Sequence, residues 1–158
     1  MEITLSPIGV VHCPHPTPEG VPIQAAFSDT VGTLEVYDDY VEGLRDIDGF
    51  DYLILVYRFH LANNERLEVT PFLDNESRGV FATRAPTRPN RIGLSTVRLL
   101  ARRGNVLDIG NVDMVSGTPV IDIKPYVPAF DSRPQCRIGW FDGKLDRAPS
   151  LRADDRMR

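Results

Sequence analysis

Short runs of branched and aromatic residues recur along the whole chain, and each run is bounded by glycine, proline, asparagine or aspartate. Runs of this kind are typical of β-strands. Because no long helical patterns alternate with them, they predict a mainly β protein, either a sandwich or a barrel. The seven expected strand segments are residues 3–11, 31–38, 50–59, 79–84, 92–100, 105–114 and 118–127.

The end of the fifth segment is ambiguous by composition. Residues 98–103 read Arg-Leu-Leu-Ala-Arg-Arg, a sequence that a helix would also accept. Gly104 and Asn105 follow directly, and the next residues alternate between apolar and polar. A Gly-Asn pair between two such runs favours a β-hairpin, so we expect a tight turn there.

One short helix is expected in residues 38–48, which read DDYVEGLRDID. Asp38 or Asp39 could cap the free amides of its first turn. At helical spacing, three apolar residues of this stretch share one face. They are Tyr40, Leu44 and Ile47.

The length of 158 residues fits a single domain, because domains usually hold ~100 to 200 residues. The residues from Arg147 onward are mostly charged or small and polar, and such chain ends usually fray. We therefore expect one domain over residues 1–146 and a frayed charged tail over residues 147–158.

The chain carries no signal for a membrane or for secretion. The longest strongly apolar run, residues 52–57, is far shorter than the ~20 residues that cross a bilayer. The N-terminus lacks the cationic start and long apolar stretch of a secretory signal. Cys13 and Cys136 allow at most one disulfide, and nothing indicates an oxidising compartment. A cytoplasmic protein is expected.

Basic charge is concentrated in the middle of an acidic chain. The net charge is −4, yet the stretch from Arg78 to Arg103 holds seven arginines and no acid. The other residues carry 11 basic groups against all 22 acids. A polyanion partner would therefore be bound locally, at this stretch, rather than over the whole surface.

Two common kinds of site are missing from the sequence. Gly-x-Gly and Gly-x-x-x-x-Gly-Lys do not occur, which excludes a Rossmann fingerprint and a P-loop. His12, Cys13 and His15 could ligate a metal, but no second pair of ligands follows them at metal-site spacing. A loop without metal is the favoured interpretation.

The sequence TRAPTRPNRIG, residues 83–93, predicts a stiff loop that can aim its side chains. Pro86 and Pro89 fix their own φ and favour extended conformations in the residues before them. The guanidinium groups of Arg84 and Arg88 suit phosphates or carboxylates, and Asn90 suits a base edge or an amide. The alternative is a solvated basic turn whose arginines pair with acids of the protein.

A second candidate group lies in residues 118–127. Asp122 and Lys124 share one face of an expected strand, and Tyr126 follows in an extended segment. A salt bridge inside a barrel would explain the charged pair without catalysis. His60 ends the most apolar strand, where it could be structural or could form a wall for a planar ligand.

Three segments together resemble one protein family. GVFATRAPTRPNRIGLS, DMVSGTPVIDIKPYVP and GFDYLILVYRFH are similar to the TsaA-like (YaeB-like, TrmO) family of S-adenosylmethionine-dependent tRNA methyltransferases. The resemblance implies a small antiparallel β-barrel, with one or two short helices, that dimerises and binds S-adenosylmethionine without a Rossmann sheet or a metal. It implies methyl transfer to N6 of a threonylcarbamoyl-adenosine next to the tRNA anticodon, whose loop phosphates would meet the arginines.

The resemblance also implies particular site residues. The methyl-acceptor side would consist of Arg84, Arg88, Asn90, Asp122, Lys124 and Tyr126, with Asp122 or Tyr126 as the group that takes the acceptor proton. The cofactor side would consist of Gln24, Ala25, Ala26, Phe27, His60, Leu61, Arg84, Leu94, Asp113, Met114, Val115 and Ser116.

The chain departs from the family pattern at two of the matched positions. Arg91 stands where the family loop usually has a second proline, and Ser116 stands where relatives commonly have an acid. A methyltransferase on another substrate, or a module that binds S-adenosylmethionine or RNA without turnover, are the alternative functions.

Overall fold

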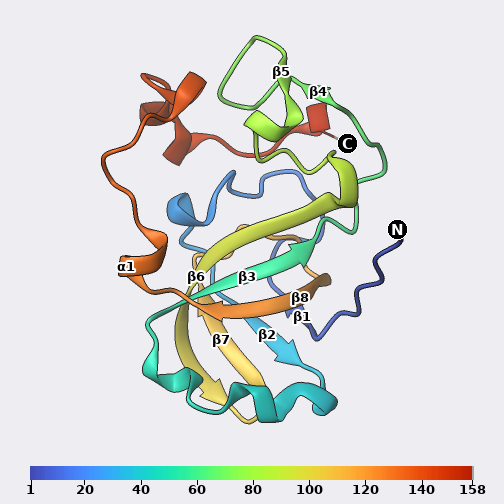
Figure 1. The fold of residues 1–158 in the computed structure, drawn as a ribbon, viewed down its shortest axis with the longest axis vertical. Coiled ribbons are helices and arrows are strands. Elements are labelled where there is room, and N and C mark those ends of the chain that lie inside the picture. The colour runs from blue at the N-terminus through green and yellow to red at the C-terminus, as the bar shows by residue number, and fades with distance from the viewer. Residues whose placement is uncertain (158) are drawn as a thin grey trace.

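Six antiparallel strands close into a barrel in the computed structural model, which describes residues 1–157. The strand order around the barrel is β1-β2-β7-β6-β3-β8, and every neighbouring pair is antiparallel (Figure 1). The bounds are β1 Gly9–His12, β2 Gly32–Val36, β3 Tyr52–Arg58, β6 Ile92–Arg103, β7 Val106–Gly110 and β8 Thr118–Pro125. The expectation of an antiparallel barrel is confirmed.

The barrel interior is filled by alternate residues of its strands. In β3 the buried positions are Leu53, Leu55 and Tyr57, and their neighbours along the strand are more exposed. This period of two is what a half-buried strand requires, because successive side chains point to opposite faces. Leu107 and Ile109 of β7 are fully buried in the same core.

The expected hairpin is confirmed, and one expected strand is wrong. β6 ends at Arg103 and β7 begins at Val106, with Gly104 in the left-handed region at φ 66°. Of residues 79–84 only Gly79 belongs to a strand, because Val80–Ala82 is a 3-10 helix that buries Val80. The run reads as β by composition, but its burial here depends on packing against Val69 and Ala85.

The helix expected in residues 38–48 is present as two 3-10 helices. Leu44 is buried as expected, but Tyr40 is exposed, so the three apolar residues do not share one buried face. Tyr37 precedes the first helix and no side chain caps it, so the predicted capping by an aspartate is wrong. A tighter 3-10 turn changes the angular spacing of side chains, which moves Tyr40 out of line.

The remaining elements lie outside the barrel wall. A small sheet pairs β4 Glu68–Val69 with β5 Arg78–Gly79, and α1 Pro128–Asp131 follows β8. We call residues 59–91, between β3 and β6, the insert, and residues 132–157, after α1, the arm. The 3-10 helices are Ala25–Phe27, Asp38–Leu44, Ile47–Gly49, Val80–Ala82, Pro89–Arg91, Gly139–Phe141, Leu145–Ser150 and Asp155–Met157.

The arm returns over one end of the barrel and packs on the insert (Figure 1). Ala148 is fully buried, and Arg152 forms a β-bridge with Pro22. The expectation of a frayed tail is therefore wrong for residues 147–153, and Arg158 lies outside the described residues. The division of the chain at 146/147 stays a prediction. In residues 1–157, no helix has the length and apolar character needed to span a bilayer.

Candidate functional site

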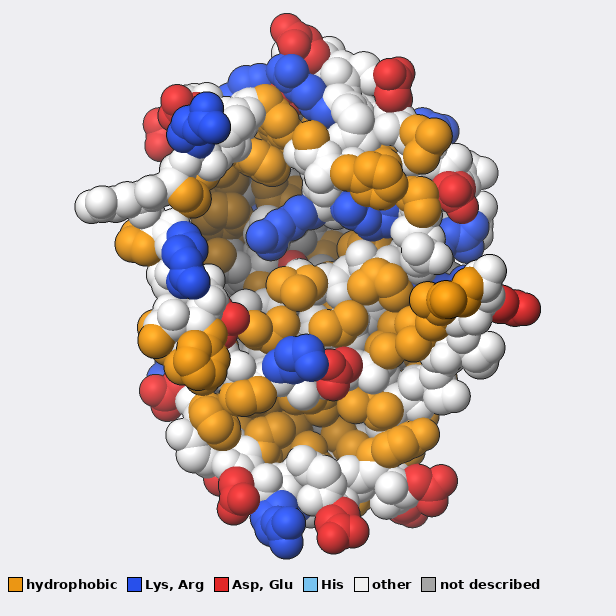
Figure 2. Space-filling model, viewed as in Figure 1, with side chains coloured by type: hydrophobic (Ala, Val, Ile, Leu, Met, Phe, Trp, Pro, Cys, Tyr) orange, Lys and Arg blue, Asp and Glu red, His pale blue; other side chains and the backbone are white. Residues whose placement is uncertain are grey.

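A cavity of about 720 Å³ lies between one end of the barrel, the insert and the arm. Figure 2 shows the hollow from outside, with basic side chains lying across it and hydrophobic side chains around it. Each wall comes from a different part of the chain. β3 and β6 supply Tyr57 and Leu94, residues 113–115 supply the turn before β8, and the arm supplies Phe141 and Leu145.

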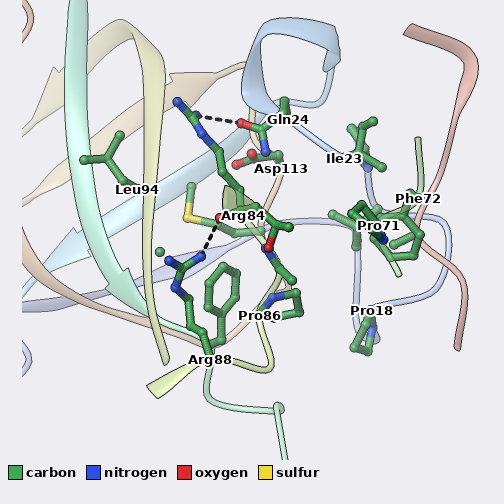
Figure 3. A pocket seen from close by; sticks show the side chains of 18 of the residues that line it. Pro18, Ile23, Gln24, Pro71, Phe72, Arg84, Pro86, Arg88, Leu94 and Asp113 are labelled. Carbon is green, nitrogen blue, oxygen red and sulfur yellow. Dashed lines mark hydrogen bonds between the residues drawn. The ribbon is translucent and has the colours of Figure 1, made fainter. Parts of the chain in front are cut away.

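The cavity has a polar half and an apolar half (Figure 3). In the polar half, Arg84 Nη1 donates to Gln24 Oε1 at 2.9 Å, and Arg88 Nη1 donates to the Thr83 carbonyl at 2.9 Å. The apolar half is lined by Pro18, Ile23, Pro71 and Phe72. Such a cavity suits a ligand with one flat uncharged part and one charged part.

A chain of buried hydrogen bonds holds the carboxylate of Asp113 at the cavity. Ser95 Oγ donates to Asp113 Oδ1 at 2.6 Å, and the Tyr57 hydroxyl lies 3.0 Å from Ser95 Oγ. Because Ser95 has one hydroxyl hydrogen and gives it to Asp113, Tyr57 must be the donor to Ser95. The three side chains come from β3, β6 and the β7–β8 connection, and the sequence alone does not bring them together.

Burial changes the acid-base behaviour of this chain. Desolvation raises the pKa of Asp113 to about 6, although Ser95, backbone amides and Arg84 act in the opposite direction. Desolvation and the nearby Asp113 also raise the pKa of Tyr57 well above its usual range, so this phenol stays neutral. The pKa of His60, on the cavity rim, is lowered by burial, which favours neutral imidazole.

The backbone of the loop at residues 83–93 takes an unusual course, and the stiffness expected from its prolines stays a prediction. Asn90 and Arg91 both lie in the left-handed region, at φ 62° and 53°. Arg91 N–H donates to the Arg88 carbonyl at 3.1 Å, and Arg91 Nη2 reaches the Asn63 carbonyl at 3.4 Å. The exposed side chain of Asn90 does not line the cavity.

The arginines of this loop do not pair with acids. Among residues 1–157, no salt bridge includes Arg84, Arg88 or Arg91. Their guanidinium groups bond to a side-chain amide or to backbone carbonyls. The described residues therefore lack the ion pairs that the alternative of a basic turn paired with the protein's acids requires, although Arg84 acts electrostatically on Asp113 across the cavity.

Most of the residues predicted to bind the cofactor lie around this cavity. Two do not: Ala25 is buried behind the wall, and the Ser116 hydroxyl accepts a hydrogen bond from Cys13 N at 3.2 Å. The predicted residues that line the cavity are Gln24, Ala26, Phe27, His60, Leu61, Arg84, Arg88, Leu94, Asp113, Met114 and Val115.

Asp122, Lys124 and Tyr126 lie outside the cavity. Lys124 Nζ and Asp122 Oδ2 form a 2.7 Å salt bridge with side chains 63% and 44% exposed, so the pair is not inside the barrel. Asp122 and Leu94 pair with the same residue, Val56, from opposite sides of β3. Two strand spacings of ~4.8 Å place Asp122 about 10 Å from the cavity rim, on the same outer face.

Three residues at or behind the cavity were not predicted from the sequence. Ser95 does not line the cavity, but its hydroxyl binds Asp113, which does. Ser95 stands two residues after the glycine of the Arg-Pro-Asn loop, and its place in that motif was an available signal. Trp140 and Phe141 of the arm stack with ring centroids 3.9 Å apart, and both line the cavity. No local sequence pattern predicts that these two rings line the cavity, because they reach it only when the arm folds back over the barrel.

The possible metal ligands of the N-terminal segment face different partners. His12 Nε2 lies 3.3 Å from Glu35 Oε2, Cys13 Sγ contacts the Met114 carbonyl, and His15 Nε2 lies 3.1 Å from Thr30 Oγ1. Within the described residues, no group of three or more His, Cys, Asp or Glu side chains could hold a metal ion.

The fold and the cavity define a small β-barrel ligand-binding protein outside the doubly wound class. Residues 10–132 match the family model described as tRNA-methyltransferase O N-terminal domain. The chain belongs to this family. Residues 133–157 of the arm lie beyond the match.

Relatives and solved structures agree with this family. A "Probable S-adenosyl-L-methionine-binding protein" of Pyrococcus abyssi is 50% identical over 156 residues, which cover 98% of this chain and 85% of the relative. The tRNA (adenine(37)-N6)-methyltransferase of Escherichia coli is 36% identical, over 84% of this chain and 61% of the enzyme. A crystal structure of TrmO from Pseudomonas aeruginosa superposes with a TM-score of 0.77 and 35% identity, over 91% of this chain and 65% of that chain.

Proposed function

We propose that the protein is an S-adenosylmethionine-dependent methyltransferase that acts on N6 of a tRNA adenosine, namely the threonylcarbamoyl-adenosine next to the anticodon. The observation that carries the proposal is the cavity, because eleven of the predicted residues, from five separate segments, line it together. The names of the relatives support both the methyl donor and the tRNA acceptor. A tRNA acceptor also supports a cytoplasmic location.

The residues of the cavity fit S-adenosylmethionine. The volume of about 720 Å³ lies within the range of ~300–1,000 Å³ usual for small-molecule sites. The apolar half suits the neutral adenine, and Arg84 in the polar half suits the carboxylate of the methionine end. When bound, S-adenosylmethionine supplies a methyl group already activated on sulfur. The protein then has to orient the acceptor and exclude water.

The arginines that lack acidic partners support an RNA acceptor. Arg84 and Arg88 line the cavity from this loop, while Arg91 of the same loop bonds to the Asn63 carbonyl. A cluster of guanidinium groups that forms no salt bridge within the protein attracts phosphates. The acidic remainder of the chain repels them, so the RNA would be bound at this loop.

We propose a homodimer built on the outer face of β3, β6 and β8. Hydrophobic side chains gather over this face (Figure 2), and Tyr52, Leu94, Leu100 and Phe130 are each at least 40% exposed. A second copy would cover them and add its own Asp122, Lys124 and Tyr126 beside the cavity rim. That arrangement would unite the predicted acceptor residues, which a single chain holds apart.

The decisive experiment is methyl transfer from labelled S-adenosylmethionine to total tRNA that lacks its own N6 methylation, followed by nucleoside analysis. Label in N6-methylated threonylcarbamoyl-adenosine is the expected result. Label in another nucleoside would indicate a methyltransferase with a different substrate. Tight binding of the donor without any transfer would indicate a binding module.

A further inference from the structure

We propose that Asp113 is the base that takes the proton from the acceptor nitrogen during methyl transfer, and that Ser95 and Tyr57 position it. This inference rests on the function proposed above. It replaces the expectation that Asp122 or Tyr126 takes the proton.

Asp113 is the one acid among the residues that line the cavity. The alternatives suggested by the sequence are placed less well. Asp122 lies outside the cavity of its own chain and its carboxylate is paired with Lys124 at 2.7 Å. Tyr126 also lies outside and packs edge-on to Tyr52, with ring centroids 6.2 Å apart. Within a single chain, location therefore favours Asp113.

The geometry keeps the carboxylate in one orientation. Ser95 Oγ binds Oδ1 at 2.6 Å, and Tyr57 in turn fixes Ser95 at 3.0 Å. Tyr57 is 4% exposed and Ser95 is 3% exposed, so both side chains are locked in the barrel wall. A base held by two buried side chains loses little entropy when the acceptor arrives, which is what proton transfer in a site requires.

The charged and titratable groups around Asp113 agree with the role of a base. Arg84 from the loop and the neutral Tyr57 from β3 are the groups that act on it electrostatically, and Arg88 and His60 line the same cavity. Burial raises the pKa of Asp113 to about 6. The carboxylate is thus ionised near neutral pH but accepts a proton far more readily than an exposed aspartate.

The chemical step is balanced. The acceptor nitrogen forms a bond to the methyl carbon as the bond from that carbon to sulfur breaks, and the electron pair of the broken bond stays on sulfur. The proton of the nitrogen passes to the Asp113 carboxylate. One positive and one negative charge thus disappear together, and Asp113 then releases its proton to water.

The test compares pH profiles of single-turnover methyl transfer for the wild type and three variants, with donor binding measured in parallel. In the wild type, the rate should fall about tenfold per pH unit below the pKa of about 6, because a protonated carboxyl cannot accept a proton. In Asp113→Asn the rate should fall ~10²-fold to 10⁴-fold, and its decrease at low pH, the acidic limb of the profile, should disappear. Donor affinity should change less than about threefold. Asp51→Asn, at an exposed aspartate, should leave the profile unchanged.

Ser95→Ala separates a positioning role from a merely structural one. The hydrogen bond from Ser95 stabilises the ionised carboxylate, so its loss should raise the pKa of Asp113 and move the acidic limb to higher pH. A merely structural serine would lower the rate equally at every pH. Carbon-detected NMR of side-chain carboxyls, without any ligand, should give a higher pKa for Asp113 in Ser95→Ala than in the wild type. The Asp113 signal is assigned by its absence in Asp113→Asn.

Each other outcome overturns the proposal. An Asp113→Asn variant that keeps its rate, or that fails because it no longer binds the donor, would show that Asp113 is not the base. So would an acidic limb that disappears in His60→Gln instead. If wild-type protein binds the donor but methylates no N6 at any pH, the proposed function itself is wrong, and the inference falls with it.

Discussion

Gly93 lies so close to the ring of Tyr57 that no side chain fits between them. A Cβ at this position would overlap ring atoms of Tyr57 and stand 2.9 Å from Cζ of Phe59. Tyr57 is the first member of the hydrogen-bond chain that ends at Asp113. The absence of a side chain at Gly93 therefore sets the position of the cavity carboxylate.

Gly93→Ala should destabilise the protein by ~1–3 kcal/mol, the usual cost of an extra methyl group in a packed core. It should also weaken binding of S-adenosylmethionine, because Tyr57 must move. Urea denaturation and calorimetry measure the two effects. Gly43→Ala is the matched control, since Gly43 lies in a 3-10 helix with nothing within 4 Å of the new methyl group. Equal stability of the two variants would contradict the packing described here.

Arg91→Pro should destabilise the loop by more than about 1 kcal/mol. Proline fixes φ near −65°, whereas Arg91 adopts φ 53° and donates its N–H to the Arg88 carbonyl. The proline that the family resemblance leads one to expect here could not take this conformation. Arg91→Gly should be neutral or stabilising by up to about 1 kcal/mol, because glycine accepts a positive φ. A denaturation midpoint of Arg91→Pro equal to that of wild type would show that the loop adopts another conformation.

Arg88→Ala should reduce methyl transfer to tRNA by at least ~10-fold, which corresponds to a loss of ~1.4 kcal/mol of transition-state contact. Donor affinity and melting temperature should change little, because Arg88 bonds only to the Thr83 carbonyl of its own loop. Arg45→Ala serves as the control, since Arg45 is exposed directly after the 3-10 helix Asp38–Leu44. If both variants lose activity equally, and only at low salt, the arginines act as a diffuse field.

The prediction for Asn90 differs, because its backbone is left-handed and its side chain does not line the cavity. Asn90→Gly keeps access to φ 62° and should retain the fold, so any loss of activity in this variant would report a side-chain contact with RNA. Unchanged activity of Asn90→Gly, together with a lower melting temperature of Asn90→Ala, would establish Asn90 as a turn residue alone.

Lys144→Ala should loosen the arm and weaken binding of S-adenosylmethionine by about tenfold. Lys144 Nζ forms a 2.7 Å ion pair with the buried Asp74, and this contact and Arg78 hold the pKa of Asp74 well below its usual range. Trp140, the single tryptophan of the chain, lines the cavity beside this ion pair, so its fluorescence should shift to longer wavelength. Arg103→Ala breaks an exposed ion pair with Asp108 and should leave the spectrum unchanged.

Asp113 should make the protein less stable as pH rises from about 4 to about 6. Its pKa is about 6 when folded and 3.8 ordinarily, so the native state holds a proton in this window that the unfolded chain has lost. A shift of about two units at 1.36 kcal/mol per unit corresponds to about 3 kcal/mol. The free energy of unfolding of wild type minus that of Asp113→Asn should fall by up to this amount across the window. A flat difference would mean that Asp113 titrates normally.

Local sequence determined the barrel strands and the hairpin. The alternation in β3 and the Gly104-Asn105 turn depend on neighbours along the chain, which is why both could be predicted from the sequence. Most of the site residues that the family resemblance implied, from Gln24 to Val115, do line the cavity.

The tertiary structure alone decided three things. The closure of the barrel joined Tyr57, Ser95 and Asp113, which are 38 and 18 residues apart, and desolvated the carboxylate. The return of the arm added Trp140 to a cavity that the sequence assigned to the barrel. The register of β8 against β3 left Asp122 on the outer face. Each depends on burial and on contacts between distant residues, and these arise only when the whole chain has packed.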